Sequence, residues 1–437
     1  MSTAKGFSRR QFLRGAAVVG AAPYVIASSA LGAPGQPAPS NRIGIGVIGV
    51  GGQGSGHLGA FVGNPEVQVI AVSDVDRTRR ENAQKRTEEA YAKKAPTGTY
   101  KGCTAYGDFR ELLARPDIDA VLIGTPENWH SLVTIAAAKA GKDIYCEKPF
   151  APTIAEGRAA ANAVKQYRRV LQVGSQERSN YKCRYACELV RNGRIGKVHT
   201  VRVNLPTDRH VMGPLPPEPI PDGFDYDMWL GPAPWAPYAR ARCHGNFRWI
   251  LDYSDGELTD RGAHVGDIAQ WGNGTDRSGP IEIEGRGEFP TDGLYNTATQ
   301  FTINYKYANG VNLTCASQPP RGVRFEGDKG WIFVHIHGGL TEAEPKSLLK
   351  SFIRPDELHL YDNTNNHHKN WFNCIRTRKE TIAPAEAGHR TSSFCHLGNI
   401  AMILGRKLKW DPDKEQFEND EAANRMVGRT MRSPWRM

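Results

Sequence analysis

Along residues 43–176 of this 437-residue chain, short apolar runs recur between longer stretches with helical spacing of apolar side chains. Continuous apolar runs are typical of parallel strands, because such strands are covered on both faces. Strands that alternate with helices predict βαβ units. We expect strands at the start of 42–61 and at 67–74, 120–126, 143–149 and 170–176, and helices at 77–95, 108–114, 132–140 and 154–167. The expected fold class is α/β, with a doubly wound parallel Rossmann sheet.

After residue 179 the pattern changes to alternation of apolar and polar residues. Alternating runs separated by turn residues predict an antiparallel sheet with one polar face. These runs are 281–289, 297–307, 311–317 and 330–336, accompanied by helical segments at 181–191, 254–271, 367–379 and 386–405, a strand at 197–205 and a proline-rich loop at 206–237. We expect three parts: a signal and linker at 1–40, a Rossmann domain at 41–178, and an α+β substrate and oligomerisation domain with a large open sheet at 179–437.

The N-terminal segment carries an export pattern. Arg9 and Arg10 are followed by "QFL", a weakly apolar Ala/Val/Gly stretch and the small-residue tail "ALGA". This resembles a twin-arginine signal, which predicts export in the folded state to the periplasm or the extracellular space. A disordered basic tail is the alternative. A protein that folds before export can carry a bound cofactor with it.

Composition excludes several function classes. The net charge of +10 includes Lys5, Arg9, Arg10 and Arg14 of the N-terminal segment, and no Lys/Arg cluster interleaved with aromatic residues follows. We therefore expect no nucleic-acid partner. No stretch of about 18 apolar residues marks a spanning helix, so we expect no stable membrane anchor. The eight cysteines form no C-x-x-C pair and are expected to be small buried side chains. Disulfide pairing after export stays open.

A glycine fingerprint stands between the first strand and the first helix. Gly49, Gly51 and Gly54 form G-x-G-x-x-G, with Gly52 as an extra glycine, and Asp74 ends the next strand. In this context the glycines permit a tight turn and close approach of a pyrophosphate to the helix N-terminus. A carboxylate at Asp74 suits the ribose hydroxyls, which favours NAD. NADP stays open, because Arg77 and Arg79 follow closely.

Two more motifs lie at strand ends, "GTPENWH" at 124–130 and "YCEKPF" at 145–150. Ligands of open parallel sheets bind outside the carboxyl ends of the strands, so both motifs should line one crevice. Lys148 could bind as a cation or move a proton, and an ordinary surface lysine is the alternative. The remaining candidate cofactor-binding residues are Thr125, Pro126, Asn128, His130, Glu147, Lys148 and Gln176.

The segment 254–271 places Asp260, His264 and Asp267 at helical spacing, so their side chains should project to one side. His264 has a pKa suited to removing a hydroxyl proton near neutrality. Asp260 could orient the imidazole or bind a neighbouring hydroxyl, and Asp267 is expected to be structural. A structural His and Asp pair without chemistry is the alternative.

Together, the nucleotide fingerprint, "EKP" at a strand end and D-x-G-x-H-x-x-D in an α+β domain resemble the Gfo/Idh/MocA family of NAD(P)-dependent oxidoreductases. The resemblance runs from Ile43 to the C-terminus. It implies that Lys148, Asp260 and His264 are the catalytic residues, with Lys148 stabilising alkoxide charge. His264 and Asp260 could also form a zinc site with either His130 or His244, but no spacing requires one and we expect no metal.

These observations predict an exported NAD(P)-dependent oxidoreductase that takes hydride from a secondary alcohol of a sugar, glycoside or polyol, with a tightly bound cofactor. One alternative is a redox-neutral glycosidase that oxidises, eliminates and re-reduces its substrate. A second alternative is a non-catalytic sugar-binding protein. We also expect a homo-oligomer, and Gln176 and Arg178 facing the nicotinamide or the substrate.

Overall fold

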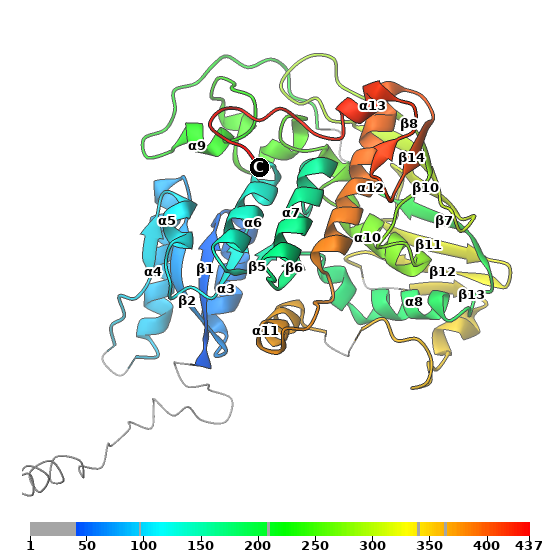
Figure 1. The fold of residues 1–437 in the computed structure, drawn as a ribbon, viewed down its shortest axis with the longest axis horizontal. Coiled ribbons are helices and arrows are strands. Elements are labelled where there is room, and N and C mark those ends of the chain that lie inside the picture. The colour runs from blue at the N-terminus through cyan, green and yellow to red at the C-terminus, as the bar shows by residue number, and fades with distance from the viewer. Residues whose placement is uncertain (1–40, 96–97, 208–209, 339–340, 362–364) are drawn as a thin grey trace, which may run out of the picture. The chain divides into compact units, whose positions relative to one another are not determined.

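A computed structural model describes residues 41–95, 98–207, 210–338, 341–361 and 365–437. The expected signal and linker at 1–40 lie outside these described residues. Residues Ile43–Met437 form one compact unit. Figure 1 shows this unit as two sheets with helices between and around them.

Six parallel strands form the first sheet, in the order β3-β2-β1-β4-β5-β6. Their bounds are β1 (Ile43–Ile48), β2 (Val67–Ser73), β3 (Thr104–Tyr106), β4 (Ala120–Ile123), β5 (Asp143–Cys146) and β6 (Leu171–Val173). Every residue of β1 is buried, which explains its continuous apolar run. The strand order reverses between β1 and β4, and this is where ligands of doubly wound sheets bind. The predicted α/β fold class is confirmed.

Helices cover both faces of this sheet. They are α3 (Gly52–Gly63), α4 (Arg77–Ala92), α5 (Phe109–Leu113), α6 (His130–Lys139) and α7 (Ile154–Gln166). A further helix, α11 (His367–Thr377), comes from the C-terminal part of the chain. Its Trp371 and Phe372 are fully buried in one cluster with Phe61 of α3 and the strands β1 and β2. The C-terminal part therefore supplies a covering helix to the first sheet.

Nine strands form the second sheet, in the order β13-β12-β11-β7-β10-β9-β8-β14-β15. Their bounds are β7 (Val198–Asn204), β8 (Glu282–Glu288), β9 (Gln300–Lys306), β10 (Asn312–Ala316), β11 (Gly322–Gly327), β12 (Gly330–His335), β13 (Thr341–Glu344), β14 (Leu408–Asp411) and β15 (Gln416–Phe417). Only β7 and β10 pair in parallel. In β9, Phe301, Ile303 and Tyr305 are buried while the residues between them face outward, as the alternation predicted.

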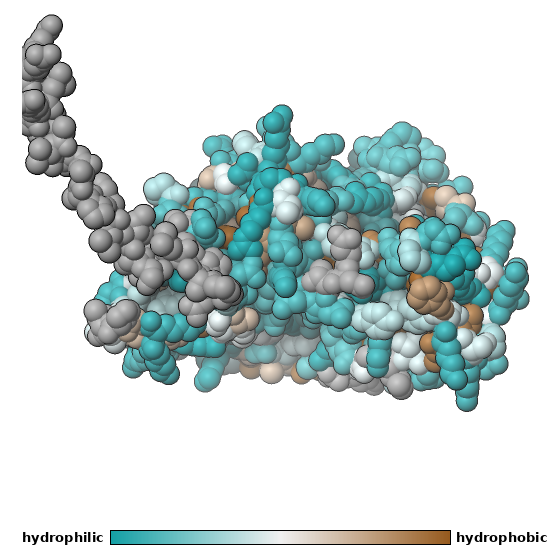
Figure 2. Space-filling model, turned by 90° about the horizontal axis from the view of Figure 1, so that it is seen from below, coloured by the Kyte–Doolittle hydropathy of each residue, from teal (hydrophilic) through white to brown (hydrophobic). Residues whose placement is uncertain are grey.

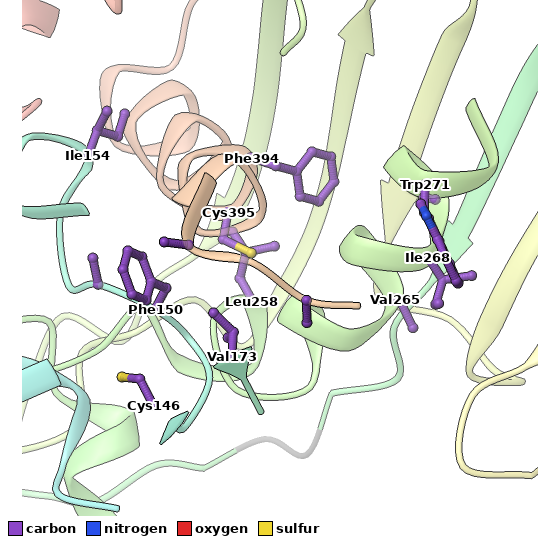
Figure 3. Packing of buried hydrophobic residues seen from close by; sticks show 14 of the residues in the cluster. Cys146, Phe150, Ile154, Val173, Leu258, Val265, Ile268, Trp271, Phe394 and Cys395 are labelled. Carbon is purple, nitrogen blue, oxygen red and sulfur yellow. The ribbon is translucent and has the colours of Figure 1, made fainter. Parts of the chain in front are cut away.

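The apolar face of the second sheet packs against three helices, α8 (Tyr181–Arg191), α10 (Gly262–Asn273) and α12 (Ala385–Leu404). Two short helices, α9 (Tyr226–Leu230) and α13 (Glu421–Arg425), lie outside this layer. Figure 3 shows Phe394 and Cys395 of α12 in the same core as Val265 of α10. Phe150, which follows β5, and Val173 of β6 belong to this core as well. One hydrophobic core thus joins the two sheets. All eight cysteines are buried with free thiols.

The segment 254–271 is not one continuous helix. A short 3-10 turn at Gly256–Leu258 precedes α10, which begins only at Gly262. Gly256 has a φ of +69°, and this left-handed conformation interrupts helical geometry. Asp260 therefore lies in the turn before α10, while His264 and Asp267 lie on the helix.

None of the helices in the described ranges is long and apolar enough to cross a membrane. The face seen in Figure 2 is mostly hydrophilic, with isolated apolar residues.

Arg178 is 2% exposed and joins the 3-10 segment Gln176–Ser179 to α10. Its Nε and Nη2 each lie 2.7 Å from a carboxylate oxygen of Asp267, and its Nη1 lies 3.1 Å from Asp276 Oδ2. The expectation that Arg178 faces the cofactor or the substrate is wrong, because its guanidinium is buried and binds these two carboxylates. Asp267 has the structural role expected for it.

We predict that Arg178→Ala lowers the free energy of unfolding by about 3–5 kcal/mol, because it leaves the buried Asp267 carboxylate without a cationic partner and with only the Thr391 hydroxyl as a donor. Denaturant unfolding followed by circular dichroism measures this change. The matched control is Arg425→Ala, whose exposed pair with Glu421 should contribute about 1 kcal/mol or less. Equal unfolding midpoints for the two variants would contradict the prediction.

Candidate active site

A cleft of about 510 Å³ lies at the carboxyl ends of β1, β2, β4 and β5, and residues of the C-terminal part close it. Twelve of the predicted site residues line this cleft: Gly49, Gly51, Gly52, Asp74, Thr125, Pro126, His130, Glu147, Lys148, Gln176, Asp260 and His264. Gly54 and Asn128 do not line it. The side chain of Asn128 is buried and donates to the carbonyl oxygen of Leu230, 3.2 Å away.

The glycine loop is closely packed against the neighbouring strand end. Gly49 has a φ of +81°, and a Cβ there would lie 2.6 Å from the amide nitrogen of Thr125. A Cβ on Gly54 would lie 1.9 Å from the carbonyl oxygen of Gly49, so Gly54 permits helix α3 to approach β1. No side chain caps the N-terminus of α3, and its first amide groups stay available for an anion.

Asp74 follows β2 and faces the glycine loop. Its carboxylate accepts hydrogen bonds from the amides of Val50 and Asp76, at 2.9 and 3.0 Å. Burial raises the pKa of Asp74 above its ordinary value, although these hydrogen bonds oppose the change. Arg79 lines the same cleft, so a carboxylate and a guanidinium both stand near the expected ribose position.

The loops after β4 and β5 are held together by His130. Its two ring nitrogens lie 2.6 Å from the carbonyl oxygen of Pro149 and 3.0 Å from that of Thr125. Burial lowers the pKa of His130, although both carbonyl contacts oppose this change; a neutral ring donates to one of the two carbonyl oxygens at a time. The hydroxyl of Thr125 is buried and has no hydrogen-bond partner among the described residues, which suits a ligand that supplies one.

Lys148 and Asp260 meet across the cleft. Lys148 Nζ donates to Asp260 Oδ1 at 2.6 Å and to the Asp260 carbonyl oxygen at 2.9 Å, and Arg248 Nε lies 3.0 Å from the same Oδ1. Burial alone would raise the pKa of Asp260, but the charges of Lys148 and Arg248 hold it well below its ordinary value. Asp260 is thus a carboxylate that positions the Lys148 ammonium. The hydrogen bonds of its carboxylate go to Lys148 and Arg248, so orientation of the His264 imidazole is not its role here.

His264 lies one turn into α10 and is buried at the cleft wall. Burial, together with the charge of Lys148, holds the pKa of His264 well below its ordinary value. The ring is therefore neutral near pH 7 and its lone pair is free for a proton. The expectation that His264 has a pKa suited to proton removal near neutrality is wrong, because burial and the Lys148 charge hold this pKa well below that range. Its Nδ1 is buried without a hydrogen-bond partner in the described part of the chain.

Three residues of the cleft were not selected from the sequence: Glu127, Arg248 and His337. Glu127 stands inside "GTPENWH", but a loop pattern does not show which side chains turn inward. Arg248 lies in the 3-10 segment His244–Trp249, which has no local chemical signature. The His337 ring packs edge-on against His264 with centroids 4.7 Å apart, and its φ of +63° is strained for a residue with a side chain.

An aromatic wall from the C-terminal part covers the outer side of the cleft. Phe224, Met228 and Trp229 line it. The wall is tied to the strand-end loops by main-chain groups: Asp225 N donates to Val75 O at 3.1 Å, and Trp129 Nε1 donates to Trp229 O at 3.1 Å. Trp129 itself is buried between Phe109 and Trp435, so packing is its main role.

No group of three or more His, Cys, Asp or Glu side chains that could hold a metal ion occurs in the described ranges. Of the histidines weighed as third ligands, His130 is occupied by two carbonyl oxygens, and His244 lies on the aromatic wall, with its ring 5.5 Å from that of Phe224.

Two domain models of one protein family match this chain. Residues 203–437 match the model described as "Oxidoreductase family, C-terminal alpha/beta domain", and residues 43–175 match "Oxidoreductase family, NAD-binding Rossmann fold" of the same family. The chain belongs to the Gfo/Idh/MocA oxidoreductase family. The resemblance inferred from the motifs is confirmed. Residues 6–23 of this family member match the model of the twin-arginine translocation signal.

Curated relatives of this Gfo/Idh/MocA chain match only part of it. Myo-inositol 2-dehydrogenase of Thermotoga maritima is 33% identical over 42% of the chain and 47% of its own length. Glycosyl hydrolase family 109 protein 2 of a Shewanella species is 34% identical over 35% of each. The match thus spans about half, or less, of these relatives. The crystal structure of the WlbA dehydrogenase of Bordetella pertussis shares the fold, with a TM-score of 0.62, 17% identity, and 85% and 99% of the two chains covered.

The residues present fit the NAD that the family's Rossmann model implies. The Gly49 turn leaves room for backbone to approach a pyrophosphate, the α3 N-terminus offers free amides, and Asp74 stands at the end of β2. The unpaired hydroxyl of Thr125 also lines this space. These groups would hold the dinucleotide along the strand ends.

The buried carboxyl group of Glu127 should make the stability of this Gfo/Idh/MocA protein depend on pH. It is 2% exposed, and Thr259 Oγ1 lies 3.4 Å from its Oε1. Burial raises the pKa of Glu127 to about 8, although a hydrogen bond from Ser254 opposes the change. Between pH 4.5 and 8 the folded state therefore keeps a proton on this carboxyl group that the unfolded state has lost, and stability falls as the pH rises through this window.

We predict that Glu127→Gln removes this contribution, so its melting temperature should fall less between pH 5 and pH 8 than that of the wild type. Calorimetric scans of nucleotide-free protein at both pH values measure the difference. Glu421→Gln on the exposed side of α13 should leave the wild-type pH dependence unchanged. Parallel curves for wild type and Glu127→Gln would exclude a neutral Glu127.

Proposed function

We propose that this chain is an exported oxidoreductase that takes hydride from a secondary alcohol of a sugar, glycoside or polyol and holds its NAD through many turnovers. The observation that carries this proposal is the convergence of three groups in the cleft that contains the glycine loop: the Lys148 ammonium, the Asp260 carboxylate beside it, and the neutral His264 imidazole.

The chemistry follows from these groups. NAD, when bound, supplies the hydride acceptor. The neutral His264 imidazole has a lone pair that can accept the hydroxyl proton of the substrate, and the burial that lowers its pKa makes it a weaker base than a free imidazole. The Lys148 ammonium stabilises the negative charge that develops on the substrate oxygen, and Asp260 with Arg248 fixes the position of that ammonium.

Retention of the cofactor is supported by the aromatic wall and by the signal. Free nicotinamide nucleotide is scarce outside the cytoplasm, and a twin-arginine route exports folded proteins. Main-chain hydrogen bonds tie the wall to the loops after β2 and β4, across the cleft. We infer a periplasmic or extracellular enzyme. We also infer NAD over NADP, because the Asp74 carboxylate would accept hydrogen bonds from ribose hydroxyls and would repel a 2′-phosphate.

A second candidate function is the redox-neutral glycosidase. Its support is the relative whose printed name is glycosyl hydrolase family 109 protein 2. The products of one glycoside distinguish the two functions, since net oxidation yields a ketone or lactone and the glycosidase yields two unoxidised fragments. A non-catalytic sugar-binding protein would have no use for the Lys148 and Asp260 pair. We also expect a homo-oligomer, measurable by light scattering, formed on the polar outer face of the nine-stranded sheet.

We predict that the exported protein retains one nucleotide per chain after extensive dialysis, and that this nucleotide is NAD. Native mass spectrometry followed by denaturation identifies it. Asp74→Ala should lose the nucleotide during the same dialysis, whereas Asp108→Ala, at an exposed helix cap, should keep it. A protein that carries no nucleotide and gains none on incubation with NAD would overturn the proposed function.

We predict that Lys148→Ala lowers turnover by about 100-fold or more while the nucleotide stays bound, because the alkoxide loses its cationic partner. Reduction of the bound nicotinamide by added carbohydrate, followed by absorbance, measures the rate. Lys101→Ala, which changes an exposed lysine, is the control. Unchanged turnover in Lys148→Ala would refute the site assignment.

A further inference from the structure

A chain of hydrogen-bonded side chains connects the cleft with the surface of α11. Glu147 lines the cleft at the end of β5, and its Oε1 lies 2.7 Å from His57 Nε2 on α3. His57 Nδ1 lies 2.8 Å from His368 Nε2 on α11. Glu147 and His57 are buried, while His368 is partly exposed. The hydride-transfer chemistry described above uses none of these three side chains.

We propose that Glu147, His57 and His368 form a proton relay between the cleft and solvent. The proposal rests on the proposed function. Oxidation of a secondary alcohol gives hydride to NAD and leaves the hydroxyl proton in the cleft, and the reverse reaction needs one proton there. Proton exchange along this chain breaks and forms only N–H and O–H bonds, and its co-reactant is water at the surface.

The protonation states make the chain continuous. Burial opposes ionisation of Glu147, yet the hydrogen bond and charge of His57 lower the pKa of Glu147 to about 2. A carboxylate only accepts, so His57 donates through Nε2; in its neutral form, its Nδ1 then accepts from His368 Nε2. Burial lowers the pKa of His368 to about 3, which keeps this ring neutral. A proton that arrives at His368 Nδ1 can therefore pass inward to Glu147 by two tautomer changes.

Aromatic rings pack around His57 and His368. The ring of Tyr145 lies 5.1 Å from that of His57 and 5.5 Å from that of His368, and the ring of Phe61 lies 4.9 Å from that of His368. The other polar side chain at the joint is Gln53, whose amide lies 3.4 Å from both Glu147 Oε1 and His57 Nε2. The neighbouring His367 is engaged by Ser179 and the Val173 carbonyl.

The inner end lies beside the reacting groups. Lys148 follows Glu147 directly, and the Lys148 amide is 3.3 Å from Glu147 Oε2. Lys148 and His264 both act electrostatically on Glu147, so its carboxylate lies within range of the proposed base. Gly174 leaves the space that the Glu147 carboxyl group fills, because a Cβ there would lie 2.7 Å from Oε1. Glu147 and His264 line the same cleft, which provides the space for proton exchange between the substrate hydroxyl and Glu147.

The test compares two substitutions at the exposed end. His368→Ala removes the outer imidazole and leaves a gap, whereas His368→Gln fills the space and can still donate to His57 but cannot exchange tautomers. We expect both variants to turn over at least about 10-fold more slowly, with a larger solvent deuterium isotope effect than the wild type. Imidazole in the buffer should restore His368→Ala and not His368→Gln. His199→Ala, an exposed histidine on β7, is the control.

A second readout needs no activity. Nitrogen NMR of 15N-histidine-labelled, nucleotide-free protein should show the Nε2–H tautomer for His57 and His368. In His368→Ala, His57 should keep this tautomer because Glu147 still accepts from its Nε2, and its Nδ1 resonance should shift because the donor to Nδ1 is lost. Normal turnover, an unchanged isotope effect and no response to imidazole in both His368 variants would overturn the relay, while loss of activity in Lys148→Ala would leave the function standing. If the wild type transfers no hydride at all, the proposed function fails instead.

Discussion

The ion pair between Lys148 and Asp260 is the contact on which the site depends. It joins the loop after β5 to the turn before α10, which are separated by 112 residues in sequence. Because the carboxylate is held ionised by two cations, the ammonium has a fixed position at the cleft wall. Both partners are mostly buried, so water screens their attraction less than it would at the surface. The site therefore exists only when both sheets have formed and docked.

The rigidity of α10 transmits this constraint to His264. Glycines on this helix allow close packing: a Cβ on Gly266 would lie 2.7 Å from the Phe394 ring, and one on Gly272 would lie 2.3 Å from the Phe325 ring. The buried pair of Arg178 with Asp267 fixes the same helix from the side of the first sheet. The His264 imidazole on such a support keeps its position although its Nδ1 has no hydrogen-bond partner among the described residues.

Short-range patterns predicted the fold and much of the cleft, and long-range pairing decided the rest. The glycine loop, Asp74, Lys148 and His264 follow from motifs at strand and helix ends. The partners of Arg178 could not be predicted, because a strand end does not show whether the next side chain turns toward the cleft or into the core. For the same reason the orientation of Glu127 toward the cleft could not be predicted, although Glu127 lies in the motif "GTPENWH". The packing of α11 on the first sheet depends on apolar contacts more than 300 residues apart, such as Phe61 with Phe372.

The unpaired polar atoms of the cleft indicate that the protein is more stable with bound ligands than without them. Thr125 Oγ1 and His264 Nδ1 are buried without hydrogen-bond partners among the described residues. Each such atom costs about 1–3 kcal/mol when no ligand satisfies it. The surrounding scaffold tolerates this cost because the loops are fixed by His130 and the helix by Arg178, so the atoms cannot move to other partners. Binding of a cofactor and a polyhydroxylated substrate would remove the cost. A bound cofactor would therefore stabilise the folded protein, because it would supply partners to these unpaired donors and acceptors.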